Sequence, residues 1–128
     1  MKRADAAVFV LGFLGCFELA HAQAALNGKW HASFEDSKGD SGATLVLSDS
    51  GGTWRHDRTG QESKRNPCVG REFPATVSTR HKDEIVISID EATTVPGCHD
   101  TRLIVKPTDP NTLEGTFKGG KPVKLVRQ

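Results

Sequence analysis

Apolar and polar residues alternate along a series of short stretches that begins at residue 28. In the first stretch, Trp30, Ala32 and Phe34 fall on one face of an extended strand, and the polar residues between them fall on the other. Turn-forming residues interrupt the pattern roughly every 8 to 12 residues, a spacing typical of antiparallel sandwiches and barrels. The pattern therefore predicts an all-β domain. The residues expected to face its core are Trp30, Phe34, Leu45, Leu47, Trp54, Phe73, Val77, Ile85, Ile87, Ile89, Leu103, Val105, Leu113, Phe117, Val123 and Leu125.

The connections between these stretches restrict the topology. Segments such as 80–83, 107–110 and 119–120 are too short for crossovers, so consecutive strands should pair as antiparallel neighbours. Eight strands in this order can close on themselves and lose both exposed edges. We expect an eight-stranded antiparallel up-and-down β-barrel, with a β-sandwich as the alternative.

The first 22 residues have the order of a secretory signal peptide. Lys2 and Arg3 precede an apolar run over residues 6–16, and Ala20-His21-Ala22 matches a peptidase cleavage site. We expect residues 1–22 to be removed by cleavage after Ala22. A single domain over residues 23–128 would then remain, secreted or periplasmic.

The apolar run also bears on membrane attachment. It is about half as long as a bilayer-spanning helix, so no transmembrane anchor is expected. A lipoprotein carrying its lipid on Cys16 is the alternative. Lipoprotein signals usually place Leu three positions before the cysteine, where this chain has Phe13, and this disfavours the lipoprotein reading.

Loss of the signal peptide leaves two cysteines, Cys68 and Cys98, in a chain bound for an oxidising compartment. We predict that they form a disulfide. The loop of about 31 residues that it closes corresponds to roughly 3.5 kcal/mol in the chain-entropy model. In an eight-strand meander both cysteines lie in connections at the same end of the barrel. The alternatives are two free thiols or a metal site that includes His99.

Charge is balanced overall, with 17 Lys and Arg residues against 16 Asp and Glu residues. This balance argues against a generally basic nucleic-acid-binding protein. Positive residues nevertheless gather around the connection 57–70 and could face an anionic partner, although an ordinary solvated loop has the same composition. No aromatic residue lies between Asp57 and Glu72 to stack on a base, which further argues against nucleic acid. The basic residues are Arg55, Arg58, Lys64, Arg65 and Arg71.

Catalytic patterns in the chain are weak. Gly39-Asp40-Ser41-Gly42 resembles the nucleophile segment of chymotrypsin-like proteases, but the chain is too short for their double barrel, and we assign the segment to a turn. The acidic pairs Asp83-Glu84 and Asp90-Glu91 are adjacent in sequence, which points their side chains to opposite faces of a strand. We assign no catalytic, cofactor-binding or metal-binding residue and expect no enzyme. The remaining histidines, expected on solvated faces and loops, are His31, His56, His81 and His99.

Both ends of the domain resemble the calycin superfamily of lipocalins and avidins. Gly28-Lys29-Trp30 is similar to the G-x-W start of their first strand, and Thr112–Phe117 is similar to a later avidin strand. The resemblance implies that Arg127 packs over Trp30 and seals one end of a barrel. Biotin is not expected as the ligand, because the chain has no Tyr and only two Trp residues.

These features predict a non-enzymatic binding protein that presents loops at one end of a disulfide-braced barrel. Residues 36–41, 57–70, 90–100 and 118–121 should meet at that end. The resemblance to calycins implies a small apolar ligand in the barrel mouth. The alternatives are an inhibitor that contacts a hydrolase through residues 57–70 and a small hydrolase with an unrecognised site. No cofactor is expected.

Overall fold

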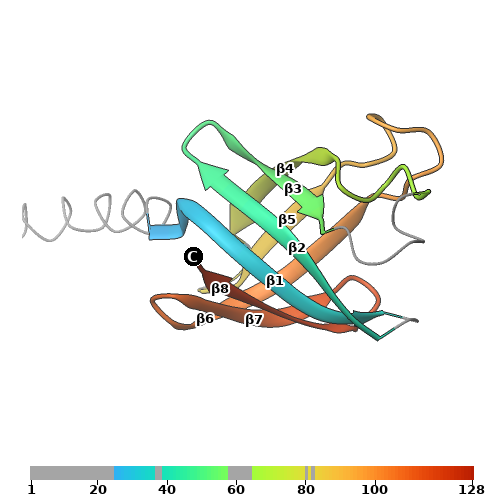
Figure 1. The fold of residues 1–128 in the computed structure, drawn as a ribbon. Helices are drawn as coiled ribbons and strands as arrows, with labels where there is room; N and C mark the ends of the chain where they lie inside the picture. The colour runs from blue at the N-terminus through green and yellow to red at the C-terminus, as the bar shows by residue number, and fades with distance from the viewer. Residues whose placement is uncertain (1–24, 37–38, 58–64, 80, 82) are drawn as a thin grey trace, which may run out of the picture.

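A computed structural model describes residues 25–36, 39–57, 65–79, 81 and 83–128. Eight strands form a closed barrel in which each strand is antiparallel to its neighbours in sequence, and the last strand pairs with the first (Figure 1). This topology confirms the up-and-down barrel and excludes the sandwich. The strands are β1 (Gly28–Asp36), β2 (Gly39–Ser48), β3 (Gly51–His56), β4 (Glu72–Thr79), β5 (Ile85–Ile89), β6 (Thr101–Asp109), β7 (Thr112–Phe117) and β8 (Pro122–Arg127).

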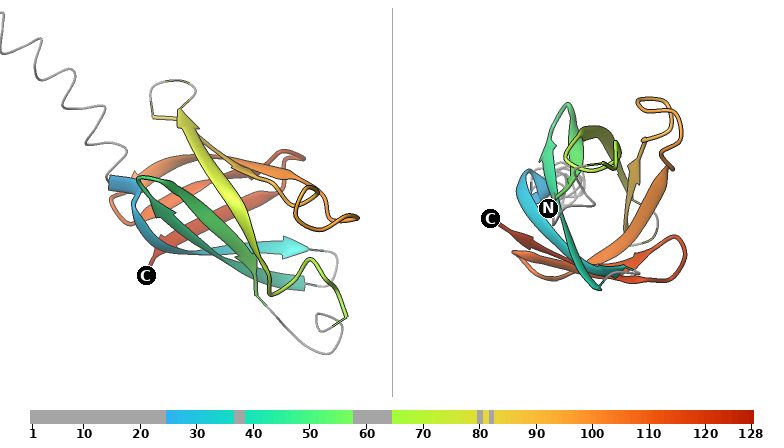
Figure 2. Two further views of the ribbon diagram at one scale, coloured as in Figure 1. Left: turned by 90° about the horizontal axis from the view of Figure 1, so that it is seen from above. Right: turned by 45° about the vertical axis from the view of Figure 1, so that its right-hand side comes forward.

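The inside of the barrel is filled by the alternating apolar residues. In β5, for example, Ile85, Ile87 and Ile89 are buried and the two residues between them are partly exposed. Figure 2 (right) looks toward one end of the barrel and shows the strands curving around this core. Burying such side chains contributes roughly 1.5–3 kcal/mol each, so the same residues that fill the barrel also stabilise it. The largest fully buried side chains are Trp30, Trp54, Phe73, Leu45, Ile87, Ile89, Leu103, Leu113, Leu125 and Val105.

Two details differ from the sequence-based expectation. Val77 was expected in the core but is 38% exposed. The pairing between β3 and β4 stops at Gly52 and Ala75, so no β3 residue lies beside Val77 to cover it. The segment Gly39–Gly42 is not a turn but the start of β2. It pairs with β1 as far as Asp36 opposite Gly39, so the expected loop 36–41 is mostly strand.

The end of the barrel where the C-terminus lies is closed by Arg127 and Trp30. The guanidinium carbon lies 4.3 Å from the centroid of the Trp30 ring. Arg127 also donates hydrogen bonds to the carbonyl oxygens of Asn27, at 2.6 Å, and Ala25. The indole N–H of Trp30 donates to the carbonyl of Leu26 at 2.9 Å. Arg127 therefore fastens the residues before β1 to the end of β8.

The predicted signal peptide, with Cys16, lies outside the described residues. Within the part of the chain that the structure describes, no helix has the length and apolar character needed to cross a membrane.

Candidate functional site at the loop end of the barrel

The described part of the connection between β3 and β4 (residues 57 and 65–71) and the connection between β5 and β6 (90–100) lie at the end of the barrel opposite the C-terminus (Figures 1 and 2). We call this the loop end. A disulfide joins Cys68 in the first connection to Cys98 in the second, with 5.8 Å between their Cα atoms. The disulfide confirms the predicted pairing and the placement of both cysteines at the same end. Cys98 is buried, and Cys68 is partly exposed.

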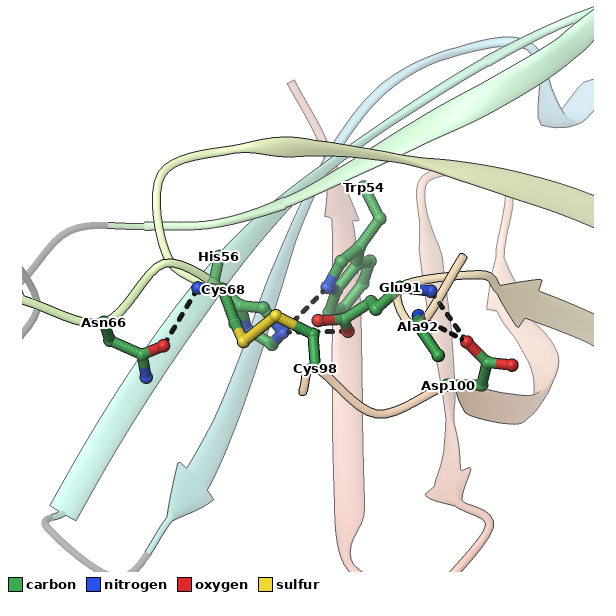
Figure 3. Close-up of a disulfide and its surroundings, with 8 residues drawn as sticks. All are labelled: Trp54, His56, Asn66, Cys68, Glu91, Ala92, Cys98 and Asp100. Atoms are coloured by element: carbon green, nitrogen blue, oxygen red, sulfur yellow. Dashed lines mark hydrogen bonds and ion pairs between the residues drawn. A yellow bond between two sulfur atoms is a disulfide. The ribbon is translucent and has the colours of Figure 1, made fainter. Parts of the chain in front are cut away.

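Local hydrogen bonds order the part of the first connection that precedes β4. The Asn66 side-chain oxygen accepts the backbone N–H of Cys68 at 2.9 Å (Figure 3). The N–H of Gly70 donates to the carbonyl of His56 at 2.8 Å, which ties the end of the connection back to β3. Such bonds satisfy backbone groups that lie outside the sheet.

Asp100 organises the second connection. Its carboxylate accepts the backbone N–H groups of Glu91, at 2.8 Å, and Ala92, at 2.9 Å (Figure 3). These two bonds favour the charged carboxylate and hold the pKa of Asp100 below its ordinary value, the bond from Ala92 having the larger effect. The side chain of Asp90 and the charge of His99 lower the pKa further. The connection is thus held by an ionised carboxylate at its C-terminal end.

Behind the disulfide, a polar pair faces into the barrel. The Glu91 carboxylate is almost fully buried, with 4% of the residue exposed, and its Oε2 lies 3.5 Å from Nε2 of His56. The indole N–H of Trp54 points at the same nitrogen from 3.2 Å (Figure 3). An imidazole nitrogen accepts a hydrogen bond when it carries no proton and donates one when it does. Nε2 can therefore accept from Trp54 or donate to Glu91, but not both at once.

His56 differs from the expectation of a solvated face, since only 26% of its side chain is exposed. Glu91, for which no role was predicted, is its buried partner. The sequence pattern could have predicted these positions, because the inward and outward alternation continues for two residues past the last apolar residue of β3 and of β5. His56 follows Trp54 by two residues, and Glu91 follows Ile89 by two, so both side chains point inward.

An aromatic cluster fills the barrel at the loop end. Phe34 and Phe117 meet edge to face with 5.0 Å between ring centroids, and the ring of Trp54 lies 6.3–6.4 Å from both. His56 contacts the Trp54 ring at 5.5 Å. We call Phe34, Trp54, His56 and Phe117 the aromatic plug. These separations are typical of favourable aromatic pairs.

The predicted basic residues are only partly described. Arg55, Arg65 and Arg71 are exposed, and Arg55 lies on β3 directly opposite Glu72 of β4. Arg58 and Lys64 lie outside the described residues. Three further exposed cations sit at the loop end, at the start of β6 and on the connection between β7 and β8, whose residues 118–121 were predicted to lie there. They are Arg102, Lys118 and Lys121.

A second polar cluster lies on the outside of the barrel. His31 Nδ1 is 3.8 Å from Oδ2 of Asp57, whose other oxygen accepts the hydroxyl of Thr44 at 3.2 Å. The cluster borders an open groove of about 1160 Å³. A Cβ atom at Gly42 would lie 3.0 Å from Asp57 Oδ2 and 3.1 Å from the His31 ring, so glycine leaves the space that this pair occupies.

One group of potential metal ligands occurs among the described residues. The two disulfide sulfurs and a carboxylate oxygen of Glu91 all lie within 4.8 Å of one another. In the disulfide the sulfurs carry no negative charge, whereas metal ions bind cysteine as thiolate. In the oxidised protein the group is therefore a packed cluster and not a metal centre.

No family model matches the chain, and no curated protein matches it. A solved structure described as a redesigned β-barrel resembles it, with a TM-score of 0.51 and 17% sequence identity over 84% of this chain and 95% of the other. At that identity the likeness concerns the fold alone. The chain is a small disulfide-containing member of the closed eight-stranded antiparallel β-barrels.

Proposed function

We propose that the protein is a secreted or periplasmic, non-enzymatic binding protein that recognises an acidic surface of a partner protein through its loop end. The observation that carries the proposal is the disulfide between two long connections at one end of a filled barrel. A bridge at this place restrains loops that a binding protein would otherwise have to order on association.

Side chains fill the interior of the barrel, so we expect the partner to bind on the outer surface. Trp30 under Arg127 occupies one end of the barrel, and the aromatic plug occupies the other. An eight-stranded barrel holds a ligand only where its own side chains leave room. A small apolar ligand in the barrel mouth is therefore disfavoured relative to a protein bound at the loops.

Charge at the loop end indicates the chemistry of the partner. Exposed Arg65 and Arg71 lie on either side of Cys68 in the connection between β3 and β4, and Lys118 and Lys121 lie on the connection between β7 and β8 at the same end. Cations at the rim of an interface accelerate and select encounters with acidic surfaces, and their effect falls with ionic strength. An inhibitor of a hydrolase with an acidic cleft is one protein of this class.

The hydrolase hypothesis has less support. Among the described residues, no hydroxyl or thiol group makes a hydrogen bond to His31 or His56, as an activated nucleophile would to its base.

Two further parts of the proposal concern family and export. The contact between Trp30 and Arg127 supports a relation to calycins. The disulfide supports export after removal of residues 1–22.

The partner is first isolated by its binding to the wild-type protein from the exported fraction of the source cells. Its affinity for two charge-reversed variants is then compared with its affinity for the wild type. Arg65→Glu/Arg71→Glu alters the loop end, and Lys29→Glu/Lys106→Glu alters exposed lysines at the opposite end as the matched control. We expect the first variant to weaken binding about tenfold or more and to reduce its dependence on salt. Equal affinities for the wild type and both variants would refute the proposal.

A further inference from the structure

We propose that reduction of the disulfide converts the inner side of the loop end into a zinc site with Cys68, Cys98, Glu91 and His56 as its four ligands. Zinc and the disulfide would then be mutually exclusive ways of holding the same two connections together. The site differs from the metal alternative of the sequence analysis, which relied on His99.

The positions of the ligand atoms support four-coordinate binding. The two sulfurs and a Glu91 oxygen lie within 4.8 Å of one another, and Nε2 of His56 lies 3.5 Å from Glu91 Oε2. In a tetrahedral zinc site, bonds of about 2.0–2.3 Å place ligand atoms roughly 3.3–3.8 Å apart. Shifts of about 1 Å would therefore bring the two sulfurs and the Glu91 oxygen around one ion. His56 lies outside this group of three and would complete the site from its place beside Glu91.

The donor set matches zinc chemistry. Two thiolates, an imidazole and a carboxylate are all established zinc ligands, and four protein ligands with no open position are typical of structural sites. Glu91 and Cys98 are buried, and the oxidised structure offers the Glu91 carboxylate an imidazole 3.5 Å away as its charge partner. A buried carboxylate is stabilised when it is paired or coordinates a metal, so zinc would take the place that the His56 imidazole has beside Glu91 in the oxidised protein.

Zinc would also replace one hydrogen bond. The lone pair of His56 Nε2 that accepts the Trp54 indole N–H is the one that would bind the ion. Trp54 would lose that acceptor when zinc binds, so its fluorescence should change. The other tryptophan, Trp30, lies under Arg127 at the far end of the barrel and is not expected to respond.

The redox step balances with a dithiol reductant. Two electrons and two protons from the dithiol break the bond between Cys68 and Cys98, giving two thiols in the protein and a disulfide in the reductant. Zinc binding then releases the two thiol protons to solvent. A disulfide oxidant reverses the sequence: two electrons pass from the thiolates to the oxidant, which takes up two protons from solvent and becomes a dithiol, while the protein sulfurs bond again and zinc is released.

The test uses Co²⁺ as a spectroscopic probe, with Zn²⁺ as competitor, on protein reduced with a phosphine. We expect one equivalent of Co²⁺ to produce thiolate charge-transfer and tetrahedral d–d absorption, Zn²⁺ to displace it, and Trp54 fluorescence to change in parallel. Oxidised protein should give none of these signals. Absence of thiolate absorption in reduced wild-type protein would overturn the proposal.

Variants test the two ligands that are not cysteines. His56→Ala and Glu91→Gln should each weaken zinc binding by about tenfold or more, because even loss of an outer partner of a ligand has an effect of that size. His99→Ala is the matched control: His99 is exposed beside Cys98 and should not alter the affinity. The proposal fails if His99→Ala weakens binding while His56→Ala and Glu91→Gln do not. The zinc affinity of each variant is measured separately on reduced protein. If one of the two ligand variants fails to fold, the affinity of the other still tests the proposal.

Discussion

Removing the disulfide should destabilise the barrel by an amount that follows from the length of the loop it closes. Cys68 and Cys98 are separated by 30 positions in the sequence. For a closed loop of about 31 residues, the chain-entropy model assigns roughly 3.5 kcal/mol to the restraint on the unfolded chain. Replacing both cysteines with alanine removes this restraint and leaves no hydroxyl group in the buried position of Cys98.

The loss in free energy corresponds to a measurable shift in melting temperature. Unfolding entropy is about 2.1 cal/mol/K per residue near 60 °C, which is about 0.2 kcal/mol/K for a domain of roughly 100 residues. A loss of roughly 3.5 kcal/mol then lowers the melting temperature by about 17 °C. The barrel itself should persist, because none of its strand pairing depends on the bridge.

The assay is urea unfolding and thermal melting of wild-type protein and Cys68→Ala/Cys98→Ala, each with and without reductant under metal-free conditions. Reductant should lower the stability of the wild type to that of the variant and leave the variant unchanged. A difference below about 1 kcal/mol between oxidised wild type and variant would refute the view that the bridge restrains the unfolded chain.

Three further predictions concern single residues. Arg127→Lys should lose about 2 kcal/mol in urea unfolding, since lysine cannot keep both the ring contact and the carbonyl hydrogen bonds; a change below about 0.3 kcal/mol would contradict this. Gly115→Ala should lose about 3 kcal/mol, because its Cβ would lie 1.9 Å from the Ile104 carbonyl oxygen. Gly119→Ala, with open space around it, should melt within about 2 °C of wild type, and equal losses in the two glycine variants would contradict the packing argument. Asp100→Asn should be less stable than wild type at neutral pH. The pKa of Asp100 is lower in the folded protein than the ordinary 3.8, so the carboxylate stabilises the fold above pH 3.8. This stabilisation is lost as the pH falls through the pKa of the folded protein. The two proteins should therefore converge in acid unfolding measurements, and a stability gap that does not vary with pH would contradict the assignment.

The strand alternation and the short connections were sufficient to predict the barrel, because only sequential antiparallel pairing can join strands through turns of a few residues. The disulfide followed from the same topology, which puts Cys68 and Cys98 at one end. The exposure of Val77 was not predictable in this way. It depends on the relative lengths of β3 and β4: β4 continues past the first residues of β3, so Val77 has no β3 neighbour.

The polar pair under the disulfide shows a different limit. Alternation alone could have placed His56 and Glu91 inside the barrel, had it been followed past the apolar residues. Their contact could not have been predicted from local spacing, because they belong to the end of β3 and to the connection between β5 and β6. Closure of the barrel and the bridge between Cys68 and Cys98 bring these segments together.

The most direct test of the proposed binding surface is photocrosslinking in the source cells from single positions at the two ends of the barrel. Photoreactive residues at Arg65 and Pro96 report on the loop end, and those at Lys29 and Pro110 report on the opposite end; all four positions are exposed. The account predicts that one partner protein, with an acidic surface, is crosslinked from Arg65 and Pro96 and not from Lys29 and Pro110. Crosslinking of the same partner from the opposite end alone would contradict it.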